Sequence, residues 1–224
     1  MRRRAVAPAF GSRCRSWTSV GPFLRCSTST KQRHGQAPPW KRIRASVWRW
    51  RSGPGLRAIY RKAHLWDAER LIFEPGDAPP PVVDTLVGRV STVICYDLEF
   101  PEWVRLPALA GTQLLCAPVN WPSYPRPAGE RPAEVVRAHA DAAVDRMYIA
   151  ACDRSGRERE IDWVGGSVVV DADGWPLSGG EPSTEVRAVI GECRLDDAED
   201  KDVGGLSNIH GDRRPELYLG VATV

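Results

Sequence analysis

The first 62 residues of this 224-residue chain contain no aspartate or glutamate. They contain 16 lysine and arginine residues, whereas residues 63–224 hold 15 basic and all 28 acidic residues. A single globular domain normally intersperses charges of both signs. The sequence therefore predicts two regions: a basic head at residues 1–55, and a body at residues 56–224 whose net negative charge works against binding to nucleic acid.

Long apolar segments are also missing. No uninterrupted apolar run approaches the roughly 18–20 residues that a membrane-spanning helix needs. The basic head has no apolar stretch of the kind that forms the centre of a secretory signal. From these two absences we expect a cytoplasmic protein that does not contact membranes.

Motifs for metals and nucleotides are absent as well. The six cysteines include no CxxC pair and no Cys/His spacing that is typical of a zinc site. The chain has no GxGxxG fingerprint and no phosphate-binding loop. The sequence therefore supports neither a structural metal nor a nucleotide cofactor.

The basic head has three interpretations. Residues 1–34 are rich in arginine and serine, as in an organellar transit peptide, while residues 48–51 alternate tryptophan and arginine, as in a nucleic-acid-binding arm. The third interpretation is an out-of-frame or mis-started sequence from a GC-rich gene, because arginine outnumbers lysine 27 to 4. Composition favours the third. Since the head shows no sustained hydrophobic period, we expect it to be disordered and to make few contacts with the body.

The body reads as alternating strands and helices, which predicts the α/β class. Apolar, β-branched runs predict strands, and apolar residues at helical spacing predict helices. The expected strands lie at residues 56–60 (running into a loop that carries Arg61, Lys62 and His64), 89–95, 112–120, 149–153, within 164–177 (two strands around an Asp-Gly turn) and 185–195. The expected helices lie at residues 99–111 and 133–148.

Three residues have the chemistry of a nucleophilic site. Cys95 stands where a buried strand ends and a helix begins, a position that exposes a nucleophile and lowers a thiol pKa. Lys62 follows an earlier strand, and an ammonium group near a thiolate stabilises both the thiolate and an oxyanion. Glu69 lies seven residues later. Each signal taken alone has a plainer interpretation: a buried apolar cysteine, and solvated surface charges.

A resemblance joins these residues. The segments YRKAHLWDAERLIFEPGD (60–77) and ICYDLEFPEWVRLPALAGTQLLCAPVNWP (94–122) resemble the nitrilase superfamily of carbon–nitrogen hydrolases. DRMYIAACDRSG (145–156), DWVGGSVVVDADG (162–174) and DRRPELY (212–218) follow in the order that is typical of that family. The resemblance implies a four-layer α–β–β–α sandwich and a homo-oligomer that needs no metal or cofactor. It also implies hydrolysis of carbon–nitrogen bonds other than peptide bonds, in a small amide, carbamoyl compound or nitrile.

The resemblance also assigns roles. Cys95 matches the nucleophile that forms a thioester, Lys62 the triad lysine, and Glu69 a second glutamate that positions the lysine and the substrate. The family pattern places substrate contacts at the backbone N–H of Tyr96, which forms part of the oxyanion hole, and at a pocket loop containing Asn120 and Trp121. We therefore expect the ammonium of Lys62 within roughly 3–5 Å of the sulfur of Cys95.

One departure from the family limits these expectations. The family has a general-base glutamate on an early strand, whereas no acidic residue precedes Lys62 here. The head is also shorter than the strands and helices that the family has in its place. We therefore expect a partial sandwich, at residues 56–224, whose catalysis is slow because thioester hydrolysis lacks a base. The alternatives are an inactive remnant of such an enzyme and a nucleic-acid-binding protein that uses the head.

Overall fold

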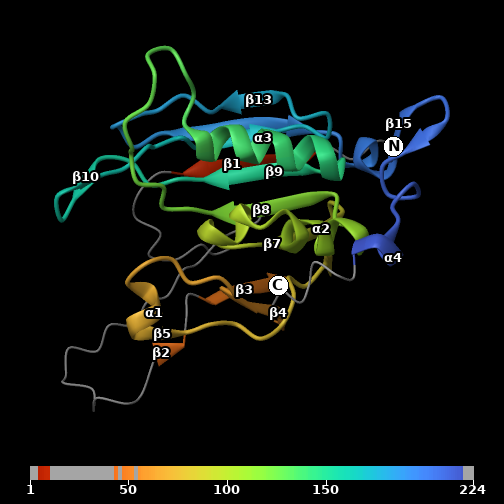
Figure 1. Ribbon diagram of the computed structural model, residues 1–224, viewed down its shortest axis with the longest axis horizontal. Coiled ribbons are helices and arrows are strands. Elements are labelled where there is room, and N and C mark those ends of the chain that lie inside the picture. Colours follow the sequence, from red (N-terminus) through yellow and green to blue (C-terminus); the bar gives the residue numbers. More distant parts are fainter. Residues whose placement is uncertain (1–4, 11–42, 45–46, 53–54, 219–224) are drawn as a thin grey trace.

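The computed structural model describes residues 5–10, 43–44, 47–52 and 55–218, and a six-stranded sheet lies at its centre (Figure 1). The strand order is β13-β12-β9-β8-β7-β6. Strands β7, β8 and β9 run parallel, and the other neighbours pair antiparallel. The strands are β6 (Val83–Asp84), β7 (Arg89–Thr92), β8 (Leu114–Pro118), β9 (Tyr148–Cys152), β12 (Val168–Val170) and β13 (Pro176–Gly179).

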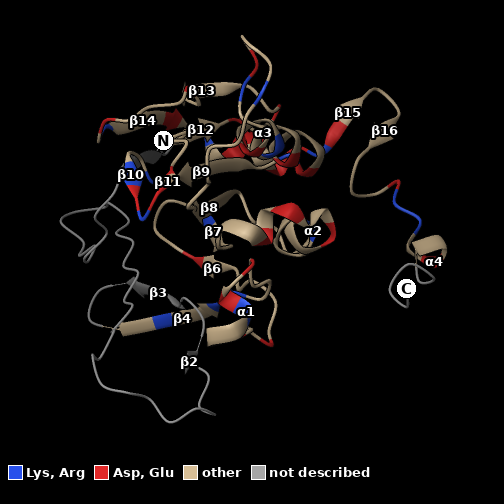
Figure 2. Ribbon diagram, turned by 60° about the vertical axis from the view of Figure 1, so that its left-hand side comes forward, with Lys and Arg blue, Asp and Glu red and all other residues tan. Residues whose placement is uncertain are grey.

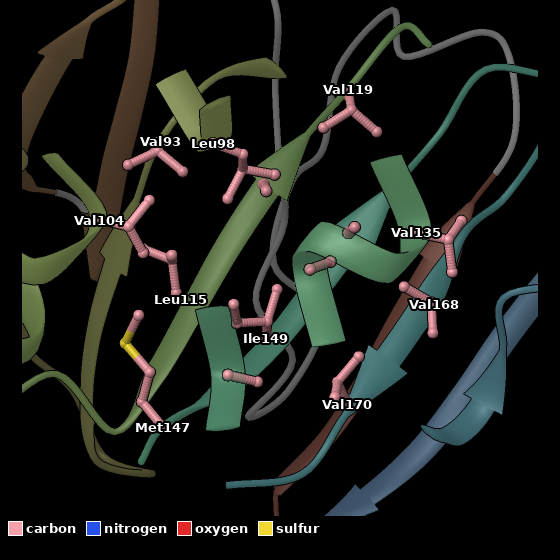
Figure 3. Packing of buried hydrophobic residues seen from close by; sticks show 14 of the residues in the cluster. Val93, Leu98, Val104, Leu115, Val119, Val135, Met147, Ile149, Val168 and Val170 are labelled. Carbon is pink, nitrogen blue, oxygen red and sulfur yellow. The ribbon is translucent and has the colours of Figure 1, made fainter. Parts of the chain in front are cut away.

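Helices α2 (Pro101–Leu109) and α3 (Ala133–Asp145) cover one face of this sheet (Figure 1). Each helix has an acidic residue in its first turn, which suits the positive end of the helix dipole, and α2 also begins with proline. Their apolar sides pack on the sheet in a core of buried hydrophobic residues (Figure 3). The labelled core residues are Val93, Leu98, Val104, Leu115, Val119, Val135, Met147, Ile149, Val168 and Val170.

A second β layer covers the opposite face. It contains β4 (Gly55–Arg61) and β14 (Ala188–Cys193). Along β14 the side chains alternate between exposed and buried, as expected for a strand with one face on the core. The buried residues of this second core include Tyr60, Val90, Leu114, Tyr148, Val169 and Val189.

The outer face of this second layer is open among the described residues. Ile59 on β4 is 50% exposed, and Ile190 on β14 is 60% exposed. A four-layer sandwich would cover such a face with helices. The described residues therefore form three layers, which are the two helices, the central sheet and the second β layer. This arrangement confirms the predicted α/β class.

The structure corrects one expectation about the basic head. Three strands lie in it: β1 (Ala5–Phe10), β2 (Ile43–Arg44) and β3 (Val47–Ser52). β1 pairs with β14 and β3 with β4, both antiparallel, and β2 runs parallel to β5 (Phe73–Glu74). The expectation of few contacts with the body is wrong for these strands. The physical reason is that sheet edges offer unpaired backbone groups, and pairing with them needs no hydrophobic period.

Most of the head lies outside the described residues. Residues 1–4, 11–42, 45–46 and 53–54 belong to this part of the chain. The interpretation as a transit peptide rests on residues 1–34, most of which lie in this part, whereas the interpretation as a nucleic-acid-binding arm rests on residues 48–51 in strand β3. The pairing of β3 with β4 tests none of the three interpretations of the head. They therefore stay predictions.

Short elements connect and extend the layers. Figure 2 shows both signs of charge on α1 (Glu69–Ile72), which begins with Glu69. The others are the 3₁₀ helices η1 (Cys95–Glu99) and η2 (Leu195–Glu199), the hairpins β10–β11 (Arg157–Glu158, Ile161–Asp162) and β15–β16 (Asp202–Gly204, Ser207–Asn208), and α4 (Pro215–Tyr218). In the described ranges, no helix has the length and apolar character needed to cross a membrane.

Candidate active site

Three neighbouring parallel strands place the residues that follow them at one edge of the sheet. Cys95 comes after β7, Asn120 after β8 and Asp153 after β9. Because parallel strands end on the same side, side chains just beyond them gather there, which is where open α/β sheets bind ligands. This edge is the candidate active site.

Cys95 occupies a sharp turn at this edge. Ile94 is extended, and the next residue, Cys95, has a φ of 49° and begins η1. Positive φ is uncommon for residues other than glycine and costs on the order of 1 kcal/mol or more. The turn leaves the thiol half-buried, with its sulfur 3.9 Å from the carbonyl oxygen of Asn120. The backbone N–H of Tyr96 follows directly, at the start of the 3₁₀ helix.

Lys62 and Glu69 form a short ion pair. Nζ of Lys62 lies 2.5 Å from Oε2 of Glu69, and Lys62 is only 2% exposed. The same Glu69 oxygen accepts a hydrogen bond from the backbone N–H of Trp66. A buried ammonium requires such a partner to offset the loss of hydration. The expectation that Glu69 approaches Lys62 is confirmed.

The charges around Cys95 act on its thiol in opposite directions. Burial raises the pKa of the Cys95 thiol to about 11, and the ammonium of Lys62 is the main influence that lowers it. The carboxylates of Glu69 and Asp153 raise the pKa further. The structure thus brings Lys62, Glu69 and Cys95 together at one site. In this arrangement Lys62 is the cation that favours the thiolate.

Asp97 is a buried carboxylate beside this site and was not predicted from the sequence. It is fully buried, and its carboxylate accepts hydrogen bonds from the hydroxyl of Tyr60 (2.7 Å), the backbone N–H of His64 (2.9 Å) and the backbone N–H of Ile94 (2.9 Å). The ring Nδ1 of His64 lies 2.9 Å from the same carboxylate. The only sequence signal was an aspartate two residues after the cysteine at the end of a buried run.

Asp153 is a second buried carboxylate that was missed. It is 1% exposed and accepts hydrogen bonds from the backbone N–H groups of Trp121 (3.0 Å), Arg154 (2.8 Å) and Gly166 (2.9 Å). Burial raises the pKa of Asp153 to about 6, and these three hydrogen bonds oppose the rise. Asp153 therefore ties together the loops that follow β8 and β9 and the segment that precedes β12.

The predicted substrate loop is divided between surface and core. Asn120 is exposed beside the thiol, whereas Trp121 is 3% exposed and packs in the core under α2 and α3. The ring of Tyr96 is half-buried and meets the ring of Phe100 edge-on at 5.2 Å. In this arrangement Asn120 and the Tyr96 backbone border the thiol, while the Trp121 ring anchors the loop.

Glu99 belongs to a different contact. Its carboxylate lies 2.6 Å from Nη1 of Arg137 on α3, and burial raises the pKa of Glu99 while Arg137 lowers it. The structure places Glu99 in an ion pair between η1 and α3, which engages its carboxylate.

Comparison with known proteins identifies the family. Residues 46–201 match the family model described as carbon-nitrogen hydrolase. This match covers more than half of the chain, so the chain belongs to the carbon–nitrogen hydrolases of the nitrilase superfamily. The resemblance inferred from the sequence segments is confirmed.

Individual relatives agree with this assignment. The chain is 33% identical over 170 residues to a nitrilase of Pyrococcus abyssi, covering 75% of this chain and 61% of that protein. It is 30% identical over 182 residues to N-carbamoylputrescine amidase of Solanum tuberosum, covering 74% and 59%. The chain thus spans about three fifths of the length of these curated relatives.

A solved structure shows the same fold. A variant of the amidase from Nesterenkonia sp. AN1 aligns with a TM-score of 0.63 and 28% identity, covering 79% of this chain and 62% of that one. That structure shows covalent addition of the acetamide moiety of fluoroacetamide at its active-site cysteine.

Proposed function

We propose that this chain attacks the carbonyl carbon of small non-peptide amides through Cys95 and releases ammonia or an amine. One observation carries the proposal: the buried Lys62–Glu69 pair acts electrostatically on a thiol that a strained turn presents at the end of a parallel strand. A nucleophile, a cation and a carboxylate at one sheet edge are the groups that acyl transfer requires.

Acylation consumes the amide in two stages. Cys95 loses its proton to solvent, favoured by Lys62, and the thiolate forms a carbon–sulfur bond with the amide carbon. The backbone N–H of Tyr96 and the ammonium of Lys62 stabilise the oxyanion of the tetrahedral intermediate. The carbon–nitrogen bond then breaks, and the departing nitrogen takes a proton from Lys62, which solvent replaces. The product is a thioester on Cys95.

Hydrolysis of the thioester completes the reaction. Water forms a carbon–oxygen bond, the carbon–sulfur bond breaks, and a carboxylic acid leaves. A base must take the proton of this water. Glu69 is engaged by Lys62 and by the Trp66 N–H, and Asp153 by three backbone N–H groups. We therefore propose that acylation is faster than deacylation in this chain.

The relatives support an amide as the substrate. One related protein is an amidase for N-carbamoylputrescine, and the aligned Nesterenkonia structure is also an amidase. The relative from Pyrococcus abyssi is called a nitrilase, so a nitrile is the alternative that a test must include. Both substrates contain an electrophilic carbon bonded to nitrogen and would react with the same thiol.

Intact-mass spectrometry of the full chain tests the proposal. We expect incubation with p-nitrophenyl acetate to add one acetyl group to Cys95, and incubation with acetamide or butyramide to release ammonia slowly. Acetonitrile serves as the nitrile arm. Adduct formation and ammonia release should both disappear in Cys95→Ala.

Cys116→Ala is the matched control. Cys116 is another half-buried thiol, on β8, and burial raises its pKa to about 12, so it should remain unmodified. An adduct that persists in Cys95→Ala, or the absence of any adduct and any ammonia in the unaltered chain, would overturn the proposal.

A further inference from the structure

Asp97 links two chain segments that carry the reactive groups. On one side it binds Tyr60 and His64, the residues two before and two after Lys62. On the other side it binds the backbone N–H of Ile94, the residue directly before Cys95. Both carboxylate oxygens take part: Oδ1 with His64, and Oδ2 with Tyr60 and Ile94.

The partners of Asp97 are themselves fixed. Nε1 of Trp103 on α2 donates a hydrogen bond to the Tyr60 hydroxyl at 2.9 Å. The ring of His64 stacks on Phe100 with a centroid separation of 3.8 Å and an interplanar angle of 17°. Tyr60 and His64 therefore each have a second contact that limits their movement. A fully satisfied buried network of this kind restricts the geometry of every member.

From this geometry we propose that Asp97 is a positioning residue, which keeps the Lys62 ammonium beside the Cys95 thiol by tying the backbone on both sides of Lys62 to the turn at Cys95. The inference rests on the proposed function, since it concerns the same site. Asp97 acts through Lys62 and Cys95 and does not itself touch the substrate.

Charge and position predict opposite effects on the thiol. A carboxylate near a thiol makes the thiolate harder to form, so a purely electrostatic role of Asp97 predicts that Asp97→Asn makes the Cys95 thiolate easier to form. A positioning role predicts the reverse, because Lys62 moves away and its lowering effect on the thiol pKa is lost. The other groups that act on the thiol are Glu69 and Asp153, which the substitution leaves in place.

The rate of Cys95 alkylation by iodoacetamide at pH 8, followed by peptide mass spectrometry, measures thiolate formation. Below the thiol pKa this rate changes tenfold for each unit of pKa shift. Asp97→Asn keeps one acceptor oxygen and replaces the other with an amide NH2 group. We expect this substitution to slow alkylation about tenfold, and Lys62→Met to slow it by a similar or larger factor. The rate of acetylation by p-nitrophenyl acetate should fall about 100-fold in Asp97→Asn.

The double variant shows whether Asp97 acts through Lys62. If it does, Asp97→Asn adds no further slowing when combined with Lys62→Met, because contacting residues that act together are not additive. Additive slowing, unchanged alkylation in Asp97→Asn, or faster alkylation in that variant would each overturn the inference.

Tyr60→Phe provides a milder variant should Asp97→Asn fail to fold. It removes one of the donors to Asp97 and should slow alkylation roughly threefold in molecules that circular dichroism shows to be folded. An unchanged rate would count against the inference. If Lys62→Met itself leaves alkylation unchanged, the proposed function fails; if only the Asp97 and Tyr60 variants leave it unchanged, the positioning role alone fails.

Discussion

Asp97 and Asp153 are two buried carboxylates near Cys95, and their partners differ. Asp97 accepts hydrogen bonds from a side chain and from backbone groups of two segments, one with Lys62 and one preceding Cys95. Asp153 accepts only backbone N–H groups, from the loops around the pocket. Asp97 therefore joins the segments that carry Lys62 and Cys95, whereas Asp153 joins the loops that follow β8 and β9 and the segment that precedes β12.

The two carboxylates also differ in how they affect the thiol. Asp153 raises the pKa of Cys95 directly through its negative charge. Asp97 affects the thiol through the position of Lys62, according to our proposal. Substitutions at the two positions should therefore separate stability from reactivity, and the following predictions test that separation.

The largest expected effect is a loss of stability in Asp153→Ala. This substitution leaves three buried N–H groups without their acceptor and should lower the free energy of unfolding by about 4 kcal/mol, measured by urea denaturation. Alkylation of Cys95 per folded molecule should not fall, in contrast to Asp97→Asn.

Glu130→Ala, at an exposed loop position, is the control and should change stability by less than about 0.5 kcal/mol. Slower alkylation in folded Asp153→Ala would show that both carboxylates position the reacting groups, and the comparison would break down.

A pH series tests the environment of Asp153. Its pKa is raised from 3.8 to about 6 in the folded chain, so folding takes up a proton between these values. The contribution of protonated Asp153 to the free energy of unfolding is fully present below about pH 4 and is lost as the pH rises through 6. Relative to Asp153→Asn, the unaltered chain should lose up to about 3 kcal/mol between pH 4 and pH 7.5.

Comparing the two chains cancels the contributions of Asp141 and Asp145, whose pKa values burial also raises, to about 7 and about 6. A stability difference that stays constant across this range would show that the pKa of Asp153 is not raised by folding.

Tyr60→Phe should have an intermediate effect on stability. It removes the hydroxyl that donates to Asp97 and accepts from Trp103, and should cost about 1–2 kcal/mol in urea denaturation. Tyr148→Phe is a suitable comparison, because that hydroxyl lies 3.5 Å from Asp197 and takes no part in the hydrogen bonds to Asp97. Equal costs for the two substitutions would contradict the importance of the Asp97 network.

The smallest expected effect is on the thiol in Asp153→Asn. Removing a negative charge near Cys95 should lower the thiol pKa slightly, and alkylation at pH 8 should become about two- to threefold faster. The direction of the change in alkylation rate is the test, because Asp97→Asn should slow the same reaction. A change of the same sign in both variants would remove the distinction between the two carboxylates.

Local patterns were enough to predict most of the sheet and both long helices. The expected strand at 112–120 contains β8 (Leu114–Pro118), because a buried parallel strand is apolar on both faces. The expected helix at 133–148 contains α3, which ends where Arg146 adopts a φ of 49°. Glycine usually marks such an end, so arginine gave no signal for the boundary.

Non-local contacts account for what the sequence did not predict. The pairing of β1 with β14 joins segments at opposite ends of the chain, and nothing in the local pattern of either strand specifies the other. Asp97 and Asp153 were missed because aspartate is usually exposed, and only the fold reveals the donors that surround them. Cys95, by contrast, was singled out from its place at the end of a strand and from the family motif around it, and its role as the nucleophile stays a proposal.

The time course of p-nitrophenol release from p-nitrophenyl acetate tests the central claim most directly. If Cys95 acylates and deacylation lacks a free base, the full chain should release a rapid burst of about one p-nitrophenol per molecule, followed by a slow steady phase. The burst should be absent in Cys95→Ala. A linear release without a burst, or a burst that survives in Cys95→Ala, would contradict the account.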